Sequence, residues 1–300
     1  MRNAYLTLIL SAILYGSIST MAKPSLNTIN PILLSSIIYL VIGVFLTIFA
    51  KLKGNLANAN GNNLKLIFID SVCGAVIGPI LFFYGLKLTN ASVASILINA
   101  EFLFSILFAI SILKERPGKI AYAGIAFIFI GLIILNAKTD NSDIFQNGHF
   151  IGNMLIIGAA MFWGLDNNIS NVILKKGTPI IRLMQIKSLI GGAITLAIVF
   201  VSNIAFSINL YQIPNLLVLS LGGFAGSLFL FLKGMKEVGT VKSVMVFSTS
   251  SAFGLIFALI FLNEQMEIWK LLSSLVLIAV GIFFITKNSH EDKKTTNMLR

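Results

Sequence analysis

The most constraining feature of this sequence is an internal repeat that covers nearly all of it. Tyr15-Gly16 aligns with Trp163-Gly164, and the same register pairs further glycines, prolines and serines. The other matches, with a slip of one or two residues before the last two, are Pro31 with Pro179, Gly43 with Gly191, Gly74 and Gly78 with Gly222 and Gly226, Ser95 with Ser243, Glu115 with Glu264, and Gly131 with Gly281. We therefore divide the chain into two copies of one unit, at 1–137 and 149–288, and a tail at 289–300.

The composition places both copies in a membrane. Of 300 residues, 57% are hydrophobic and 11% are charged, which is too apolar for a water-soluble core. Ten apolar stretches are about 20 residues long, enough to cross a hydrocarbon layer as helices. They lie at 3–22, 30–50, 65–86, 90–112, 119–136, 150–174, 180–203, 214–232, 239–262 and 268–287. The sequence thus predicts an all-α membrane protein with ten transmembrane helices. Because five is odd, the second five-helix repeat should be inverted relative to the first.

The basic residues between these stretches predict the orientation of the chain. The net charge of +11 would suggest nucleic acid in a soluble protein, but here the basic residues gather on one side of the predicted membrane, so we expect no nucleic-acid partner. That side holds Arg2, Lys51, Lys53, Lys65, Lys114, Arg116, Lys119, Lys175, Lys176, Arg182, Lys233, Lys236, Lys242, Lys287, Lys293, Lys294 and Arg300. The other side has Lys23, Lys87, Lys138 and Lys270. Both termini are therefore expected in the cytoplasm, and the protein in the cell membrane.

Residues that bind metals or cofactors are sparse in this chain. The single Cys73 excludes an intramolecular disulfide and a cysteine-rich metal site. His149 and His290 have no ligand-type neighbours at metal spacing. The phosphate-binding loop of ATPases, Gly-x-x-x-x-Gly-Lys-Ser/Thr, is also missing from the sequence. We expect no metal and no cofactor, so any energy for activity would come from an ion or solute gradient.

The residues that match between the two copies resemble those of a known family. The aromatic-glycine pairs Tyr15-Gly16 and Trp163-Gly164, the prolines Pro31 and Pro179, and the acidic residues of Leu113-Lys114-Glu115 and Leu262-Asn263-Glu264 are similar to EamA-type transporters of the drug/metabolite transporter superfamily. The resemblance covers the chain from about Tyr5 to Lys287. It implies two inverted five-helix repeats around a central substrate cavity. Members of this family export or import amino acids, other metabolites, nucleotide-related compounds and drugs.

Glu101 is the first candidate functional residue, because a charged side chain near the bilayer centre costs about 2.5–3.5 kcal/mol and needs a reason. It falls mid-way along 90–112, two residues after Asn99. Its carboxyl could load and release a proton, or bind the amine or guanidine of a cationic substrate. It could also be a protonated acid bonded to a neighbouring helix. Its repeat equivalent is near Thr249, within the run Ser248-Thr249-Ser250-Ser251, so the predicted helix 239–262 should also present polar groups at mid-depth.

Asp166 and Lys187 form the second candidate pair. Counted from the turn between their helices, they lie at comparable depth, beside Asn167, and could form an ion pair. Such a pair could be purely structural, or it could act in gating or coupling. Asp70, nearer the predicted cytoplasmic end of its stretch, is expected at the membrane interface.

Aromatic residues could form the walls of the site. Tyr15 and Trp163 are repeat mates at mid-membrane, where each could stack on a planar or cationic ligand or simply fill space. Tyr39 is the repeat mate of Lys187, so both of their helices are expected to turn a polar position inward. The Gly74-x-x-x-Gly78 and Gly222-x-x-x-Gly226 stripes predict close helix packing in both copies.

These features together predict a secondary transporter or exporter that moves a small organic metabolite, an amino acid or amine-bearing compound, by alternating access. Proton coupling is a further hypothesis, and we expect a monomer or weak homodimer in the lipid bilayer. A membrane-embedded lipid-modifying enzyme is disfavoured, because the chain lacks a His, Cys or acidic cluster for such chemistry. A non-transporting membrane sensor subunit is disfavoured because no loop is long enough to form a soluble signalling domain.

Overall fold

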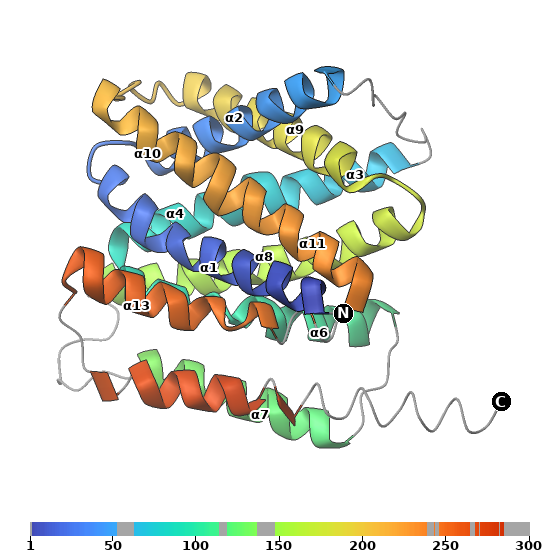
Figure 1. Cartoon of the computed structure of the whole chain (residues 1–300). Helices are drawn as coiled ribbons and strands as arrows, with labels where there is room; N and C mark the ends of the chain where they lie inside the picture. The colour runs from blue at the N-terminus through green and yellow to red at the C-terminus, as the bar shows by residue number, and fades with distance from the viewer. Residues whose placement is uncertain are drawn as a thin grey trace.

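The computed structural model describes residues 2–52, 63–113, 119–136, 148–238, 243, 246–264, 268–269, 271–281 and 283–284. These residues form a bundle of helices that lie side by side along a common direction, left to right in Figure 1. The described part of the chain contains no strand. The predicted tail at 289–300 and the loop around Glu115 lie outside the described residues.

Among the described residues, six helices are long and apolar enough to cross a membrane, as expected of a multi-pass membrane protein. They are Ala4–Ser25, Pro31–Leu52, Leu64–Leu88, Gly148–Lys175, Ile180–Val201 and Leu210–Gly234. Four further apolar helices are shorter: Ala91–Ser105, Tyr122–Gly131, Ser250–Leu262 and Leu271–Gly281. Each of the ten overlaps one of the stretches predicted from the sequence, but within the described residues only the first six reach the length expected of a crossing.

The first half contains the following elements. They are α1 (Arg2–Ser25), α2 (Pro31–Leu52), α3 (Leu64–Val72), η2 (Cys73–Ile77), α4 (Gly78–Leu88), α5 (Ala91–Leu97), α6 (Ala100–Leu113) and α7 (Lys119–Asn136). The second half contains α8 (Gly148–Lys175), α9 (Ile180–Val201), η3 (Leu210–Gln212), α10 (Ile213–Leu217), η4 (Val218–Gly226), α11 (Ser227–Val238) and α13 (Ser250–Leu262). Elements α3, η2 and α4 form one continuous rod, and η3, α10, η4 and α11 form its counterpart.

The repeated proline marks the start of a helix in both halves. Pro31 opens α2, where its missing N–H costs nothing, and the Asn30 side chain accepts a hydrogen bond from the Ile32 N–H at 2.9 Å. Pro179 is the residue immediately before α9 and has an extended backbone. The fixed backbone angle of proline therefore sets where each of these helices begins.

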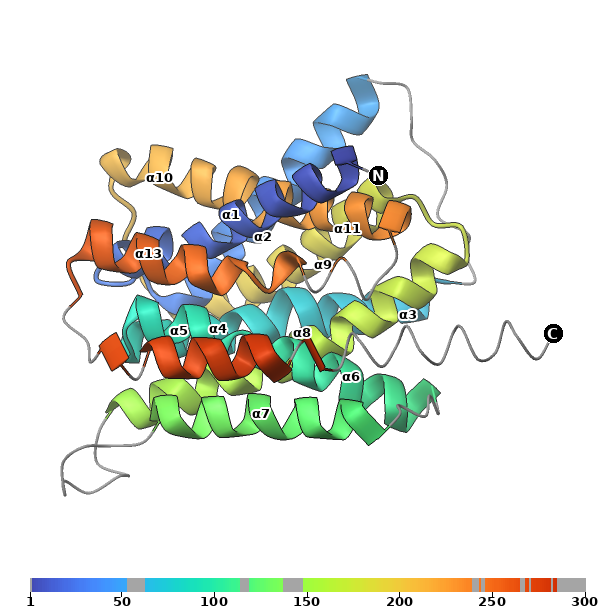
Figure 2. The same cartoon turned by 60° about the horizontal axis from the view of Figure 1, so that its bottom comes forward.

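Equivalent helices of the two halves pack antiparallel against one another, as an inverted repeat requires. In α2 and α9, Ser36 Oγ donates to the Gly192 carbonyl at 3.3 Å, whereas the later Thr47 accepts from the earlier Gln185 at 2.9 Å. A low residue number in one helix thus meets a high number in the other. Figures 1 and 2 both show α2 lying along α9.

Two further pairs of equivalent helices show the same crossing of residue numbers. Ser92 of α5 meets Glu264 just after α13, and the later Asn99 bonds the earlier Ser251. Helix α7 runs beside Leu271–Gly281 in both views, with Gly131 against Ile278 and Gly281 against Gly124. The second copy is therefore turned over relative to the first.

The helices expected at 90–112 and 239–262 are interrupted, although the sequence predicts each as one continuous helix. The first is divided into α5 and α6 by a turn at Ile98 and Asn99, and the second has a turn at Ser248 and Thr249 just before α13. Short polar side chains offer the backbone alternative hydrogen-bond partners and so weaken a helix locally. The interruptions fall at corresponding depths of the two halves.

The close packing predicted for the two glycine stripes is found at both glycines of the first stripe and at Gly226, but not at Gly222. Side chains of α8 lie directly on Gly74 and Gly78, so that an added Cβ would overlap the Asp166 carboxylate and, at 2.5 Å, the Trp163 indole. A Cβ on Gly222 would meet only Val218 Cγ1, at 3.8 Å. The prediction is therefore confirmed for the first stripe and wrong for Gly222, because the neighbouring helix α1 contacts Gly223 instead, through Ile18 at 3.1 Å.

Candidate functional site

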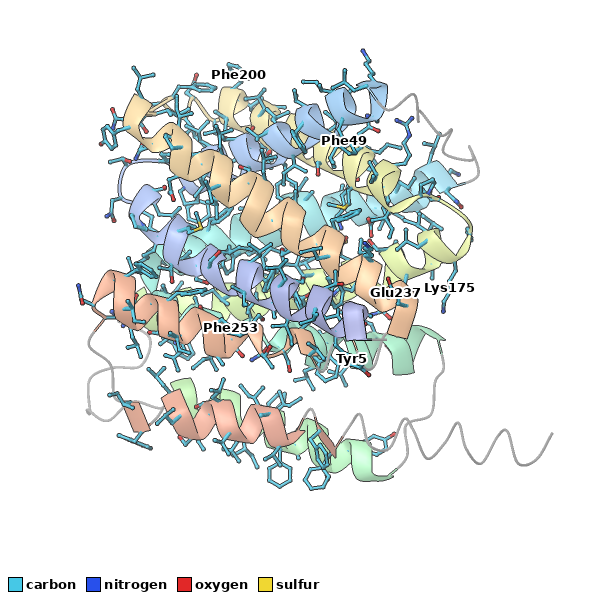
Figure 3. The ribbon with its side chains drawn as sticks, in the orientation of Figure 1. Tyr5, Phe49, Lys175, Phe200, Glu237 and Phe253 are labelled. Carbon is cyan, nitrogen blue, oxygen red and sulfur yellow. The ribbon has the colours of Figure 1, made fainter. Side chains whose placement is uncertain are left out.

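A cavity of about 80 Å³ with both apolar and polar walls lies among the helices of both halves. Its walls are Tyr15, Tyr39, Ile42, Gly74, Glu101, Trp163, Asp166, Asn167, Met184, Lys187, Ser188, Phe224, Ala225, Ser227, Leu228, Phe231 and Phe247. An adjoining hollow of about 40 Å³ shares the Glu101 wall and also contacts Asn99 and Ser248. The structure thus brings together every site residue predicted from the sequence except Thr249. Figure 3 shows how densely side chains fill the bundle around it.

Thr249 is exposed, and its hydroxyl donates to the Val246 carbonyl of its own chain segment at 2.7 Å. The true counterpart of Glu101 follows from the packing of the two aromatic-glycine pairs. Gly164 lies against Glu101, Phe104 and Ser105, and Gly16 lies against Ser250, Phe253 and Gly254. Ser250 is therefore the structural equivalent of Glu101. Ser250 lies one residue after Thr249, within the run Ser248-Thr249-Ser250-Ser251 in which the sequence predicted the equivalent.

Glu101 is held by neutral hydrogen-bond donors. The Tyr15 hydroxyl donates to Glu101 Oε2 at 3.1 Å, and Asn167 Nδ2 donates to Oε1 at 2.6 Å. Within the described residues, both ion pairs belong to Lys187, so Glu101 has hydrogen bonds but no paired cation. Aromatic rings stand beside it, because Phe247 packs on Tyr15 with centroids 4.8 Å apart and on Phe231 at 4.5 Å. The arrangement can accept a positively charged group.

Lys187, which lies in the wall of the same cavity, interacts with two carboxylates. Its ammonium contacts Asp166 Oδ1, which confirms the predicted ion pair, and lies 3.5 Å from Asp70 Oδ2. The Ser170 hydroxyl donates to the Asp70 carboxylate at 2.9 and 3.1 Å. We refer to Asp70, Lys187 and Asp166 as the charged triad.

The surroundings of Asp70 were not evident from its place in the sequence. Its side chain is fully buried and lies 3.5 Å from Lys187 of the second half, whereas its depth relative to the membrane interface stays a prediction. Depth along the sequence does not reveal which face of a helix a residue occupies. A signal was present nonetheless: Asp70, Gly74 and Gly78 are spaced four apart and so share the face that meets α8.

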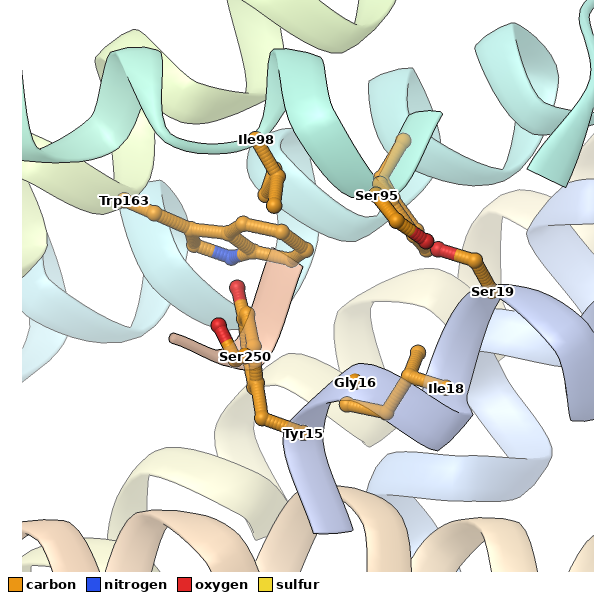
Figure 4. Close-up of a pocket in the computed structure, with 9 residues that line it drawn as sticks. Tyr15, Gly16, Ile18, Ser19, Ser95, Ile98, Trp163 and Ser250 are labelled. Carbon is orange, nitrogen blue, oxygen red and sulfur yellow. The ribbon is translucent and has the colours of Figure 1, made fainter. Parts of the chain in front are cut away.

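The carbonyl of Gly74 holds two aromatic walls of the cavity. It accepts from Trp163 Nε1 at 3.0 Å and from the Tyr39 hydroxyl at 2.9 Å. Gly74 lies in η2, a wide π-type turn of helix, and such turns often occur at functional sites. Figure 4 shows Trp163 and Tyr15 facing one another across a small hollow that Ser95 and Ser250 also line.

Two charged side chains fasten the end of the bundle where α1 and α13 end. The Glu264 carboxylate accepts from the N–H groups of Ala91 and Ser92 at 2.6 and 2.9 Å, so it caps the first turn of α5. Lys23 donates to the Leu86 carbonyl at 2.7 Å near the end of α4. The family-like acidic residue after α13 therefore ties the two halves together. A groove of about 770 Å³ between α1, α10 and α13 is lined by polar and apolar groups without charge.

Comparison with known proteins now decides the family. The chain matches the EamA-like transporter family twice, over residues 2–137 and 150–287. This chain belongs to the EamA-like transporter family. The resemblance stated from the sequence is thereby confirmed, and both the family and the relatives indicate a membrane transporter.

Two relatives of this EamA-like transporter align with it over most of its length. An uncharacterized transporter of Methanothermobacter thermautotrophicus is 30% identical over 297 residues, covering 95% of this chain and 86% of the relative. One from Clostridium kluyveri is 26% identical over 310 residues, covering 99% and 98%. A protein of known crystal structure is similar in fold, with a TM-score of 0.67 at 16% identity, covering 95% of this chain and 96% of that one.

Proposed function

We propose that this EamA-like transporter is a secondary transporter that moves a small amine-bearing organic metabolite by alternating access. The observation that carries the proposal is Glu101, a carboxylate in the central cavity that is held by Tyr15 and Asn167 and has no paired cation among the described residues. A carboxylate flanked by aromatic rings matches an organic ammonium group, which gains both charge attraction and cation–π contact.

The inverted arrangement supports alternating access. Antiparallel halves with their polar groups between them can close one end while opening the other. The Lys23 and Glu264 contacts fasten one end of the bundle, and the cavity of about 80 Å³ is well below the roughly 300 Å³ at which sites for drug-sized ligands begin. Substrate entry therefore requires the halves to move apart.

The membrane arrangement that we propose follows the charge distribution. The four shorter apolar helices complete ten crossings, made by the units at 1–137 and 149–288. Both termini and the tail at 289–300 lie in the cytoplasm of the cell, and the end fastened by Lys23 and Glu264 faces outward across the plasma membrane. The transporter works as a monomer or weak homodimer.

Binding and transport can be tested in two steps on the whole protein. Thermal unfolding in detergent is first measured with a panel of amino acids, polyamines and guanidines, because a ligand that binds the folded state stabilises it. Uptake of the stabilising compounds into proteoliposomes is measured next. Glu101→Gln should abolish stabilisation and uptake, because it removes the only charge that we assign to the ammonium, whereas Glu101→Asp should retain part of both.

Thr249→Val is the matched control, because Thr249 lies close in sequence to the cavity wall but is exposed and bonded to its own segment. It should bind and transport like the natural protein. If Glu101→Gln transported amines normally but lost the pH dependence of uptake, Glu101 would bind a proton and the substrate assignment would be wrong. If no panel compound moved across the bilayer, amine transport itself would be contradicted.

A further inference from the structure

The charged triad holds more negative than positive charge. Asp70 and Asp166 share the single ammonium of Lys187, and the Asp70 carboxylate is fully buried. With all three groups ionised the triad has a net charge of −1 in a medium where an uncompensated charge is costly. A site of this kind favours the uptake of one further positive charge.

The surroundings show that the carboxylates are positioned for this arrangement. Gly74 has no side chain where the Asp166 carboxylate lies, and the Ser170 hydroxyl donates to both oxygens of Asp70. Asp166 and Lys187 line the cavity, whereas Asp70 lies behind them. A charge that enters the cavity can therefore reach the triad directly.

The free space at the triad suits a proton better than a metal ion. Asp166 already contacts the ammonium, and the described residues contain no cluster of three or more His, Cys, Asp or Glu side chains arranged to hold a metal. A hard cation such as Na⁺ would need several oxygen ligands around it, as Ca²⁺ and Mg²⁺ do. A proton needs one oxygen lone pair.

We propose that the charged triad is the site where this transporter takes up and releases a coupling proton, separate from the substrate-binding carboxylate Glu101. The proposal rests on the transport function proposed above. One aspartate oxygen forms an O–H bond with a proton taken from water that enters from one side of the membrane. Lys187 stays charged and keeps one ionised partner, and the same O–H bond breaks when the cavity opens to the other side.

Three titratable groups interact with the charges of the triad: Tyr39 of α2, Cys73 of η2 and Glu101 of α6. Tyr15 of α1 lines the same cavity, and Arg182 lies five residues before Lys187 on α9. Tyr15 donates to Glu101, Tyr39 donates to the Gly74 carbonyl, and Arg182 donates to Gln185 at 2.9 Å. None of these three hydrogen bonds supplies a cation to Asp70.

The geometry also links the triad to the substrate site. Asp166 contacts Lys187, and the next residue, Asn167, donates to Glu101. A change in the Asp166 ion pair that rotates or shifts α8 therefore moves the donor that positions Glu101. Proton uptake at one site and amine binding at the other are coupled through two adjacent residues of a single helix.

Infrared difference spectroscopy tests the proton site without any substrate. The full protein, reconstituted in lipid, is stepped between acid and neutral pH, with the proton as the only probe. We expect a protonated carboxyl band that shifts when aspartate is labelled with a heavy carbon isotope. The band should be lost in Asp70→Asn or Asp166→Asn and should persist in Glu101→Gln.

The outcomes separate this proposal from the proposed function. An unchanged band in both asparagine variants, or a band that responds to Na⁺ instead of pH, would overturn the proton assignment. Should the asparagine variants fail to fold, Ser170→Ala keeps both carboxylates, and its band should titrate at a displaced midpoint; a natural midpoint would count against the triad. In proteoliposomes the folded asparagine variants should lose proton-driven accumulation of the amine but keep amine exchange. If the natural protein itself transported no amine, the proposed function would be contradicted instead.

Discussion

The contact between α3–η2 and α8 places Asp70 and Asp166 beside Lys187 of α9, whereas the equivalent contact between η4 and α1 is apolar at Ile18 and Gly223. In the sequence repeat, Asp70 corresponds to Val218, Asp166 to Ile18, and Lys187 to Tyr39. At the apolar interface, Ile18 packs on Gly223 in the region where the other half has a carboxylate against a glycine. Both interfaces place a glycine of one helix against a side chain of its neighbour. The packing of these helices therefore does not need the charges of the triad. A functional role would explain why the charges are present in one half.

Removing the cation should have the largest effect. Lys187→Gln leaves two buried carboxylates without a positive partner, and breaking a buried ion pair in this way costs about 3–5 kcal/mol. Ile18→Val, in the equivalent apolar interface, should cost about 0.5–1.5 kcal/mol. Unfolding of both variants in the same detergent at neutral pH provides the measurement. Equal losses of stability in the two variants would mean that the triad contributes no more than ordinary side-chain packing.

The two equivalent glycines offer the next largest contrast. Gly74→Ala places a methyl group on the Asp166 carboxylate, and overpacking of this kind costs about 1–3 kcal/mol. Gly222→Ala meets only Val218 at 3.8 Å and should change stability by no more than about 0.5 kcal/mol. The same unfolding assay measures both. A neutral Gly74→Ala would show that Asp166 can move away freely and that its position is not fixed by η2.

The smallest effect is expected at the repeat mate of Lys187. Tyr39→Phe removes one hydroxyl that donates to the Gly74 carbonyl, and a neutral hydrogen bond contributes about 0.5–1.5 kcal/mol. Trp163 still donates to the same carbonyl, which limits the loss. The unfolding transition and proteoliposome uptake should both stay close to the natural values. A loss of stability as large as that of Lys187→Gln would show that Tyr39 matters as much to the fold as its charged repeat mate.

Much of the frame could be predicted from the sequence because it depends on local patterns. Pro31 and Pro179 mark helix starts through the fixed angle of the proline ring. The ion pair between Asp166 and Lys187 could be predicted because both were counted from one shared turn. Glu101 could be predicted to line the cavity because a lone carboxyl in an apolar helix has few other stable places.

The missed features depend on the angular position of residues around a helix. One residue turns a helix by about 100°, so the single step from Thr249 to Ser250 exchanges an exposed side chain for a buried one. Asp70 was placed by its depth alone, and the face that it shares with Gly74 was not considered. The turns that interrupt the two helices depend on contacts between halves, such as the bond from Asn99 to Ser251, which no local pattern contains.

The double hydrogen bond at Gly74 has a mechanical consequence. Trp163 and Tyr39 come from opposite halves of the chain, yet both donate a hydrogen bond to the same peptide oxygen in the π-type turn η2. A swing of that one peptide plane would free both rings together. The chamber would then expand in a single concerted event, without passing through a form in which one wall has retracted and the other has stayed.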